Sequence, residues 1–171
     1  MKISHFAWLI LFLGVWAFRQ TGNADTSELH KISGSAIVTD GDTIKINDVR
    51  IRLLGIDACE RGQKALQEGI EVDCYQTSKE YLEGLVDGNT VECGYEDEDR
   101  YQRPLAICRV DDLDINSEMI RAGQAVIYRY RGRATYPELE VIESRAKADK
   151  IGLWATQFIS PSEYRKLRRK R

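Results

Sequence analysis

Residues 33–58, SGSAIVTDGDTIKINDVRIRLLGIDA, contain two turn motifs that separate three runs rich in β-branched and apolar residues. The turns are TDGD at 39–42 and Asn-Asp at 47–48, and short Asx-rich turns between such runs are typical of β-hairpins. The second turn is short enough to pair Ile46 with Val49. This part of the chain is therefore expected to be β-structure.

Further along the chain, two more strand-like runs and three helical segments follow. Apolar spacing, capping residues and glycine stops predict helices over 62–87, from Asp114 or Asn116 to Ala122, and over 137–150. The expected strands are 33–38, 43–46, 49–56, 90–95 and 105–110. Five strands with interspersed helices predict an α+β domain built on a five-stranded antiparallel β-barrel of the OB type, although a small sandwich gives the same strand count.

Length and composition indicate a single globular domain. The chain has 171 residues, of which 43% are hydrophobic and 30% charged, with 13 Gly and 3 Pro. These values exclude collagen-like, low-complexity and wholly disordered proteins. The formal net charge is -2, so the chain is not a polycation that coats nucleic acid indiscriminately.

The N-terminus has the pattern of a secretory signal peptide. The apolar run 6–18 is shorter than the roughly 20 residues that span a bilayer, and small residues precede a cut after Ala24. We expect a signal peptide over 1–24, a linker over 25–32, and a periplasmic or secreted protein. The alternative is an uncleaved anchor, in which case the protein is bound to a membrane.

The folded domain is expected over 33–160, followed by a basic tail over 161–171. Six of the last seven residues, from Arg165 to Arg171, are Lys or Arg. Such a run is either a solvated tail or a flexible arm that binds phosphate groups, because clustered cations displace counterions from polyanions.

The chain has four cysteines, and an even number in an exported protein argues for two disulfides. A hairpin centred on residues 100–101 would place Cys93 opposite Cys108, which leaves Cys59 with Cys74. The sequence alone leaves the connectivity open. A zinc site is disfavoured because the chain lacks a CxxC motif, and its two histidines lie outside the expected domain.

A cluster of carboxylates is expected at one end of the barrel. The register of the turn at 47–48 brings Asp40 and Asp42 near Asp57. Neighbouring carboxylates repel one another unless a cation lies between them. Oxygen ligands without His or Cys select Ca²⁺ or Mg²⁺, and an irregular site that includes a backbone carbonyl, such as that of Ala58, favours Ca²⁺.

Two arginines and a glutamate near this cluster are suited to phosphodiester hydrolysis. Arg52 precedes Asp57 in the same strand-like run, and Arg103 follows the DRYQR turn. A planar guanidinium can bind two phosphate oxygens and stabilise negative charge that develops in the transition state. Glu60 lies three residues after Asp57, where it could accept a proton from an attacking water.

Motifs spread along the chain resemble the thermonuclease, or staphylococcal-nuclease-like, family, and its exported four-cysteine members in particular. The matching motifs, in order, are DGDT at 40–43, RLLGIDAxE at 52–60, DRYxRxLA at 99–106, NxxMIRAGQAxxYxY at 116–130 and GLW at 152–154. The resemblance covers about residues 33–158 and implies an OB-fold barrel with three helices. It also implies calcium-dependent cleavage of DNA and RNA to products with 3′-phosphates.

The resemblance assigns roles to individual residues of this chain. The implied metal-binding groups are Asp42, Asp57 and the Ala58 carbonyl, with Asp40 close by. The implied catalytic and substrate-binding residues are Arg52 and Arg103 on the phosphate, Glu60 as general base, Tyr101 near phosphate, and Tyr128 and Tyr130 in the nucleotide pocket. Ordinary core packing is the alternative role for the last two tyrosines. No obligate protein partner is implied.

This chain departs from the family pattern at two positions. Cys59 replaces a proline between Asp57 and Glu60, and Gln102 replaces the glycine before Arg103. Neither change removes a predicted ligand or charged catalytic group.

The sequence therefore predicts a secreted, calcium-dependent nuclease. The alternatives are a catalytically silent module that binds nucleic acid or another polyanion at the cell envelope, and an accessory protein in polysaccharide export or assembly.

Overall fold

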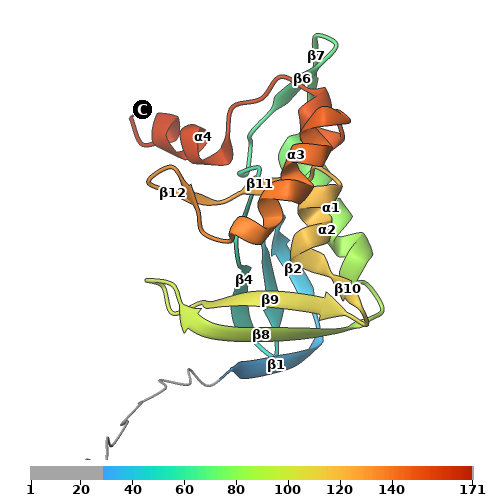
Figure 1. The fold of residues 1–171 in the computed structure, drawn as a ribbon, viewed down its shortest axis with the longest axis vertical. Coiled ribbons are helices and arrows are strands. Elements are labelled where there is room, and N and C mark those ends of the chain that lie inside the picture. The colour runs from blue at the N-terminus through green and yellow to red at the C-terminus, as the bar shows by residue number, and fades with distance from the viewer. Residues whose placement is uncertain (1–28, 171) are drawn as a thin grey trace, which may run out of the picture.

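The computed structural model describes residues 29–170, which form a mixed α+β fold with four α-helices and several sheets (Figure 1). The strands are β1 (His30–Ser35), β2 (Ile37–Asp40), β3 (Thr43–Ile46), β4 (Val49–Leu53), β5 (Ile56–Ala58), β6 (Ala65–Gln67), β7 (Ile70–Val72), β8 (Thr90–Glu98), β9 (Pro104–Val110), β10 (Leu113–Asp114), β11 (Ala125–Ile127), β12 (Arg129–Tyr130) and β13 (Arg133–Ala134). The helices are α1 (Cys74–Val86), α2 (Ile115–Arg121), α3 (Glu140–Ala148) and α4 (Pro161–Arg168), with 3₁₀ helices η1 (Pro137–Leu139) and η2 (Gly152–Ala155). The expected signal peptide 1–24 lies outside the described residues. His30, expected in the linker, begins β1.

The hairpin of β3 and β4 has the register that its turn sequence predicts. β3 and β4 pair antiparallel with Ile46 opposite Val49, which confirms the prediction. The two residues between these strands have φ of 48° and 67°, the positive values that a two-residue type I′ turn requires. The same register places Arg52 opposite Thr43, next to the turn that contains Asp42.

The main sheet has the strand order β1-β8-β9-β4-β3-β2, with β10 paired to β9. β4 and β9 pair in parallel, whereas the other pairs along this order are antiparallel. The pairing is an open path, because within residues 29–170 no hydrogen-bonded pair of strands joins β1 to β2. The expected strand 33–38 is divided into β1, which pairs with β8, and β2, which pairs with β3.

The expected strand 49–56 is also divided, into β4 and β5. Gly55 lies between them with φ of 80°, and a Cβ there would lie 2.6 Å from the Cβ of Tyr136. Only glycine fits this bend, because other residues rarely adopt that backbone conformation and would collide with Tyr136. The bend directs the chain into β5, which pairs with β11 rather than with the main sheet.

Helices α1, α2 and α3 lie together beside the sheet in Figure 1, and their apolar faces close the core. Ile44 and Leu53 from the sheet, Leu82 from α1, Met119 from α2 and Leu139 from η1 are at most 1% exposed. Burial of a side chain of this size stabilises a fold by about 1.5–3 kcal/mol. The core therefore fixes the strands that bear the candidate site.

The helix expected over 62–87 is shorter than predicted. Its first half forms the hairpin β6–β7, because the turn at 68–69 has φ of 52° and 83° and Leu66 exchanges backbone hydrogen bonds with Gln157. α1 begins only after Asp73, whose side chain accepts a hydrogen bond of 3.1 Å from the backbone N–H of Gln76. An N-cap of this kind sets the start of a helix.

The next two helices lie where the sequence predicts them. Asp114 caps α2 by accepting a hydrogen bond of 2.8 Å from the backbone N–H of Ser117. Asn116, the other candidate cap, is buried instead and bonds to the backbone of the sheet. The expected helix 137–150 consists of η1 and α3.

The basic segment at 161–171 differs from the expected tail or flexible arm, because Pro161–Arg168 form a fourth helix, α4. Ser160 and Glu163 form a capping box, in which the Ser160 hydroxyl accepts from the backbone N–H of Glu163 at 3.3 Å and the Glu163 carboxylate accepts from the backbone N–H of Ser160 at 3.1 Å. Pro161 at the first turn suits a helix start.

Two disulfides are present, and they confirm the pairing suggested by the hairpin. Cys93 and Cys108 lie opposite each other on β8 and β9 with Cα atoms 4.1 Å apart. Cys59 and Cys74 are joined with Cα atoms 5.8 Å apart. Disulfides are typical of proteins outside the cytoplasm. Within residues 29–170, no helix has the length and hydrophobicity needed to cross a membrane.

Candidate active site

Asp42 lies in the turn before β3, and this turn packs tightly against β5 and α1. A Cβ on Gly41 would lie 2.2 Å from the Ser78 hydroxyl oxygen and 2.9 Å from the Ala58 Cβ. A larger residue at this position would therefore push the turn away from β5. Oδ2 of Asp42 accepts a hydrogen bond of 3.1 Å from the backbone N–H of Ala58. The Asp42 carboxylate is thus held against β5.

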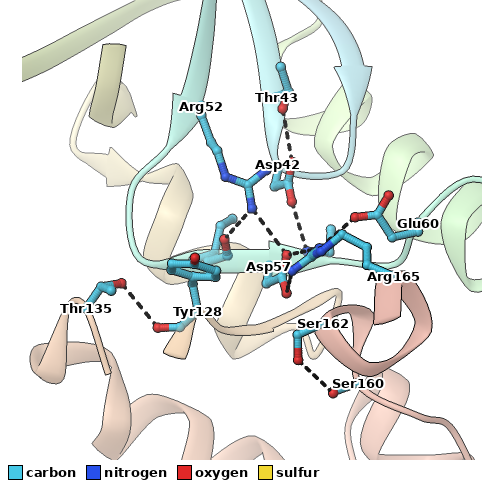
Figure 2. A network of polar contacts seen from close by, with 12 residues as sticks. Asp42, Thr43, Arg52, Asp57, Glu60, Tyr128, Thr135, Ser160, Ser162 and Arg165 are labelled. Atoms are coloured by element: carbon cyan, nitrogen blue, oxygen red, sulfur yellow. Dashed lines mark hydrogen bonds and ion pairs between the residues drawn. The ribbon is translucent and has the colours of Figure 1, made fainter. Parts of the chain in front are cut away.

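Arg52 connects the two buried carboxylates of the site (Figure 2). Its Nη1 donates to Oδ1 of Asp42 at 2.8 Å, and its Nη2 donates to Oδ1 of Asp57 at 3.2 Å. Its guanidinium lies 6.0 Å from the centre of the Tyr128 ring. Burial lowers the pKa of Arg52, but the charges of Asp42 and Asp57 outweigh this effect and raise the pKa above its ordinary value.

Asp57 on β5 is 2% exposed and is shared between two arginines. Arg165 on α4 makes two parallel hydrogen bonds to it, from Nη1 to Oδ1 and from Nη2 to Oδ2, both of 2.8 Å. Burial raises the pKa of Asp57, and the charge of Asp42 adds to this, although Arg165 and Arg52 act in the opposite direction. The net shift is upward, so these cations do not fully offset burial beside a second carboxylate.

Glu60 lies two residues beyond β5, and local contacts fix its backbone. Its N–H donates to Oε1 of Gln63 at 3.0 Å, and the preceding residue, Cys59, is tied to α1 by the disulfide to Cys74. This disulfide supplies a constraint at the position where the family pattern has proline. Oε1 of Glu60 accepts a hydrogen bond of 2.6 Å from Nη1 of Arg165.

Asp40 lies in the same cleft as Asp42 but is bonded elsewhere. Its Oδ1 accepts a hydrogen bond of 3.2 Å from the hydroxyl of Tyr75 on α1. Within residues 29–170, no group of three or more His, Cys, Asp and Glu side chains is placed to hold a metal ion. The structure thus brings Asp42 and Asp57 together through Arg52, with Asp40 nearby.

Arg103 follows the turn between β8 and β9, where Gln102 replaces glycine. Gln102 has φ of 59°, so the turn requires the conformation that glycine adopts most easily. Asp99 holds the turn, because its Oδ1 accepts from the backbone N–H groups of Tyr101 and Arg103 at 2.8 and 3.0 Å. Its Oδ2 accepts from Nε and Nη2 of Arg103 at 2.8 and 2.5 Å. Arg103 remains in the cleft despite the departure.

These side chains line a single cleft of about 1180 Å³. The predicted site residues along it are Asp40, Asp42, Arg52, Ala58, Glu60, Tyr101, Arg103, Tyr128 and Tyr130. Asp57 borders an adjoining cavity of about 340 Å³. Tyr101 and Tyr130 are 63% and 59% exposed, so neither is a core residue, and exposed aromatic rings in a basic cleft are suited to stacking against bases.

The oxygen atoms of this site match the ligand preference of Ca²⁺. Asp42 and Asp57 contribute carboxylates, and Ile56 and Ala58 are two residues apart in β5, so their carbonyl groups point to the same side of the strand. The Ile56 carbonyl faces Arg52, from which it accepts a hydrogen bond of 3.4 Å. Hard oxygen donors without nitrogen or sulfur suit Ca²⁺ and Mg²⁺. The residues present therefore fit such an ion.

A second buried carboxylate, Glu143 on α3, supports the wall of the cleft. It is 2% exposed, and its Oε1 accepts from the backbone N–H of Ile127 on β11 at 2.8 Å. Its Oε2 accepts from Nη2 of Arg129 at 2.8 Å and from Nζ of Lys147 at 2.7 Å. These contacts fix the end of β11 just before Tyr128 enters the cleft.

The sequence did not predict the place of Arg165 in the site. The basic run predicts a solvated tail or a flexible arm, yet the Arg165 side chain contacts both Asp57 and Glu60. A local signal was available, because Ser160-Pro161 followed by Glu163 has the form of a capping box with proline at the first turn. That signal predicts a helix but not the position at which it packs.

Comparison with known proteins supports the resemblance. A family model described as staphylococcal nuclease homologue matches residues 50–156. An uncharacterized endonuclease of Escherichia coli O157:H7 is 38% identical over 123 residues, covering 69% of this chain and 73% of that protein. The succinoglycan biosynthesis protein ExoI of Rhizobium meliloti is 32% identical over 136 residues, covering 78% and 70%. A micrococcal nuclease of Shigella flexneri is 28% identical over 131 residues, covering 69% and 70%.

Proposed function

Because this chain belongs to the staphylococcal nuclease homologue family and is a nuclease, we propose that it is an exported, calcium-dependent enzyme that hydrolyses both DNA and RNA. The observation that carries the proposal is the convergence of Asp42, Glu60 and two arginines on one cleft, with a second buried carboxylate, Asp57, bonded to one of these arginines at the adjoining cavity. These are the groups that hydrolysis of a phosphodiester requires, and they come from separate segments that only the fold brings together.

Each residue has a role that follows from its place in the cleft. Arg52 and Arg103 bind the non-bridging phosphate oxygens and offset the charge that develops in the transition state. Glu60 accepts the proton of the attacking water, because its carboxylate lies at the edge of the cleft rather than in the core. Loss of the 5′-oxygen as a hydroxyl leaves the phosphate on the 3′ side.

Asp42, Asp57 and the Ala58 carbonyl would hold the cation in this proposal. A calcium ion at these oxygens supplies positive charge next to the phosphate. Tyr101, Tyr128 and Tyr130 lie around the cleft that receives the nucleotide. Stacking of bases on tyrosine tolerates any sequence, in keeping with a nuclease that acts on both DNA and RNA.

Two further features belong to the proposal. The strand order, the break between β1 and β2, and the bend at Gly55 support a barrel of the OB type, in which β2–β5 form the walls next to the site. The two disulfides and the apolar run at 6–18 support export across the cytoplasmic membrane.

The test is cleavage of single-stranded DNA and RNA by the disulfide-intact protein with calcium, with magnesium alone, and with a chelator. We expect cleavage that requires calcium and leaves 3′-phosphate ends. The Glu60→Gln variant should lose about 10²- to 10⁴-fold in rate while its affinity for the substrate changes little. Absence of cleavage by the folded protein, with DNA still bound, would instead favour the catalytically silent polyanion-binding module.

A further inference from the structure

Arg165 occupies the carboxylates that the proposed reaction needs. Its guanidinium forms three hydrogen bonds: two of 2.8 Å to the two oxygens of Asp57 and one of 2.6 Å to Glu60 (Figure 2). In the sequence, Arg165 lies 108 positions after Asp57 and 105 positions after Glu60. Paired guanidinium–carboxylate bonds of this geometry are among the stronger ion pairs in proteins, and here one partner is 3% exposed at its side chain.

The position of Arg165 is set by folded structure before it. The backbone of Gln157 pairs with that of Leu66, and Nε2 of Gln63 donates to the carbonyl of Ile159 at 2.8 Å. The capping box at Ser160 then starts α4 at a fixed place. Figure 1 shows α4 beyond the end of the sheet and near β12, where it borders the cleft. Arg165 therefore reaches the site as part of a docked helix.

The Arg165 contacts oppose the binding of a cation at Asp57. Both carboxylate oxygens of Asp57 accept hydrogen bonds from Arg165, so a cation that uses either oxygen meets a guanidinium at hydrogen-bond distance. The positive charge of Arg165 repels a divalent ion at this distance as well. Arg165 also bonds to Glu60, and the Glu60 oxygen that accepts this hydrogen bond is not free to contact an attacking water.

We propose that Arg165 is an intramolecular competitor of the divalent cation, and that α4 must withdraw it from Asp57 and Glu60 before the cation binds. The inference rests on the proposed function, since it takes the cation site to include Asp57. The arrangement in which Arg165 bonds to Asp57 and Glu60 is then the resting form of the enzyme. It also makes calcium affinity a property of the C-terminal helix as well as of the carboxylates.

Calcium affinity measured by titration calorimetry tests this inference without reference to catalysis. We expect Arg165→Gln to bind calcium about tenfold or more tightly than the unaltered protein, within the usual range for coupled sites. Lys166→Gln is the matched control, because it removes the same charge from the neighbouring position on α4. It should change the affinity by no more than about twofold. Equal or weaker binding by Arg165→Gln would overturn the proposal.

Two further measurements distinguish the loss of a competing side chain from a general loosening of the fold. Arg165→Lys keeps the charge but cannot make the paired bonds, so its calcium affinity should fall between those of Arg165→Gln and the unaltered protein. In the unaltered protein, calcium should speed hydrogen exchange of the α4 backbone amides, because binding displaces the helix. Unchanged exchange in α4 at saturating calcium would contradict the proposal.

Cleavage assays on the same samples separate this inference from the proposed function. Tighter calcium binding by Arg165→Gln without cleavage of DNA would support Arg165 as a competitor of the cation and would contradict the proposed calcium-dependent nuclease activity. Calcium-dependent cleavage with equal calcium affinities in all variants would contradict the role of Arg165 as a competitor and would support the proposed nuclease activity. No calcium binding by any of the variants would overturn both.

Discussion

Asp57 and Glu143 are both 2% exposed and each accepts hydrogen bonds from two cationic side chains, yet their pKa values move in opposite directions. Burial acts to raise the pKa of both. For Asp57 this effect prevails, and the pKa rises. For Glu143 the bonds from Arg129, Ile127 and Lys147 outweigh burial, and the pKa falls.

Burial has the largest effect on the pKa of Asp57, and the surroundings of the two carboxylates add to the difference between them. Asp57 lies beside another buried carboxylate, Asp42, with which it shares Arg52. Glu143 accepts a backbone N–H and has no acidic side chain among its hydrogen-bond and ion-pair partners within the described part of the chain. The cations around Asp57 therefore do not fully offset its burial, which is typical of a functional site, whereas the bonds to Glu143 outweigh its burial and support the fold.

The largest expected effect comes from Asp57→Asn. The change removes a ligand of the proposed cation site and should lower the rate of cleavage by at least about 10²- to 10³-fold, as loss of a preorganised charge in an active site does. The free energy of unfolding should change little or rise, because a carboxylate with a raised pKa is destabilising when ionised. Rates under saturating calcium and urea-induced unfolding measure the two quantities.

The opposite result would remove the distinction between the two regions. A folded Asp57→Asn variant with full activity would show that Asp57 has no part in the reaction. Loss of several kcal/mol in unfolding free energy, with activity kept, would place Asp57 in the same class as Glu143.

Glu143→Gln should affect stability rather than chemistry. The amide oxygen can still accept from the Ile127 N–H, but both ion pairs are lost, so we expect a loss of about 2 kcal/mol in unfolding free energy. Activity of the folded variant at low temperature should stay within a few-fold of the original, because Glu143 bonds to none of the proposed site residues. Urea unfolding and an assay at low temperature provide the check, and an unchanged unfolding midpoint would contradict it.

The pH dependence of stability sharpens the comparison. The pKa of Glu143 is lowered from 4.5 in the folded protein. Its contribution to the free energy of unfolding is therefore fully present above pH 4.5 and is lost as the pH falls through the lowered pKa. The difference in unfolding free energy between the original and Glu143→Gln should therefore shrink below pH 4.5. For Asp57 the sign is reversed, since stability is lost as the pH rises from 3.8 through its raised pKa.

Lys147→Gln should have the smallest effect. The Lys147 side chain is 43% exposed, and Glu143 keeps its bonds to Arg129 and to the backbone when this lysine is removed. Exposed ion pairs contribute about 0–1 kcal/mol, so a loss of less than about 1 kcal/mol is expected from chemical unfolding. A loss as large as that of Glu143→Gln would show that the lysine, rather than the arginine and the backbone, holds the carboxylate.

The first part of the site could be predicted because its residues are close in sequence. Turn residues fix the register of β3 and β4, so Asp42 and Arg52 meet through a hairpin that local sequence specifies. The motif that contains Asp57 and Glu60 follows directly. The Cys93–Cys108 bridge followed from the same kind of argument, since the two cysteines face each other across one hairpin.

The parts that escaped prediction depend on distant contacts. Residues 62–73 have helical spacing, but the backbone of Leu66 pairs with Gln157, 91 positions away, and holds this segment as a hairpin. The role of Arg165 depends on the docking of α4 against a site formed more than 100 residues earlier. No local pattern reports such contacts, because they arise from packing between elements rather than from the order of residues within one.

The most direct test of this account is the effect of calcium on the free energy of unfolding of three proteins: the original, Asp57→Asn and Glu143→Gln. A ligand that binds only the folded state stabilises it by an amount that grows with the logarithm of the ligand concentration divided by its Kd. The account predicts that calcium stabilises the original and Glu143→Gln by equal amounts and leaves Asp57→Asn unchanged. Equal stabilisation of all three proteins would show that the cation does not bind at Asp57 and would contradict the account.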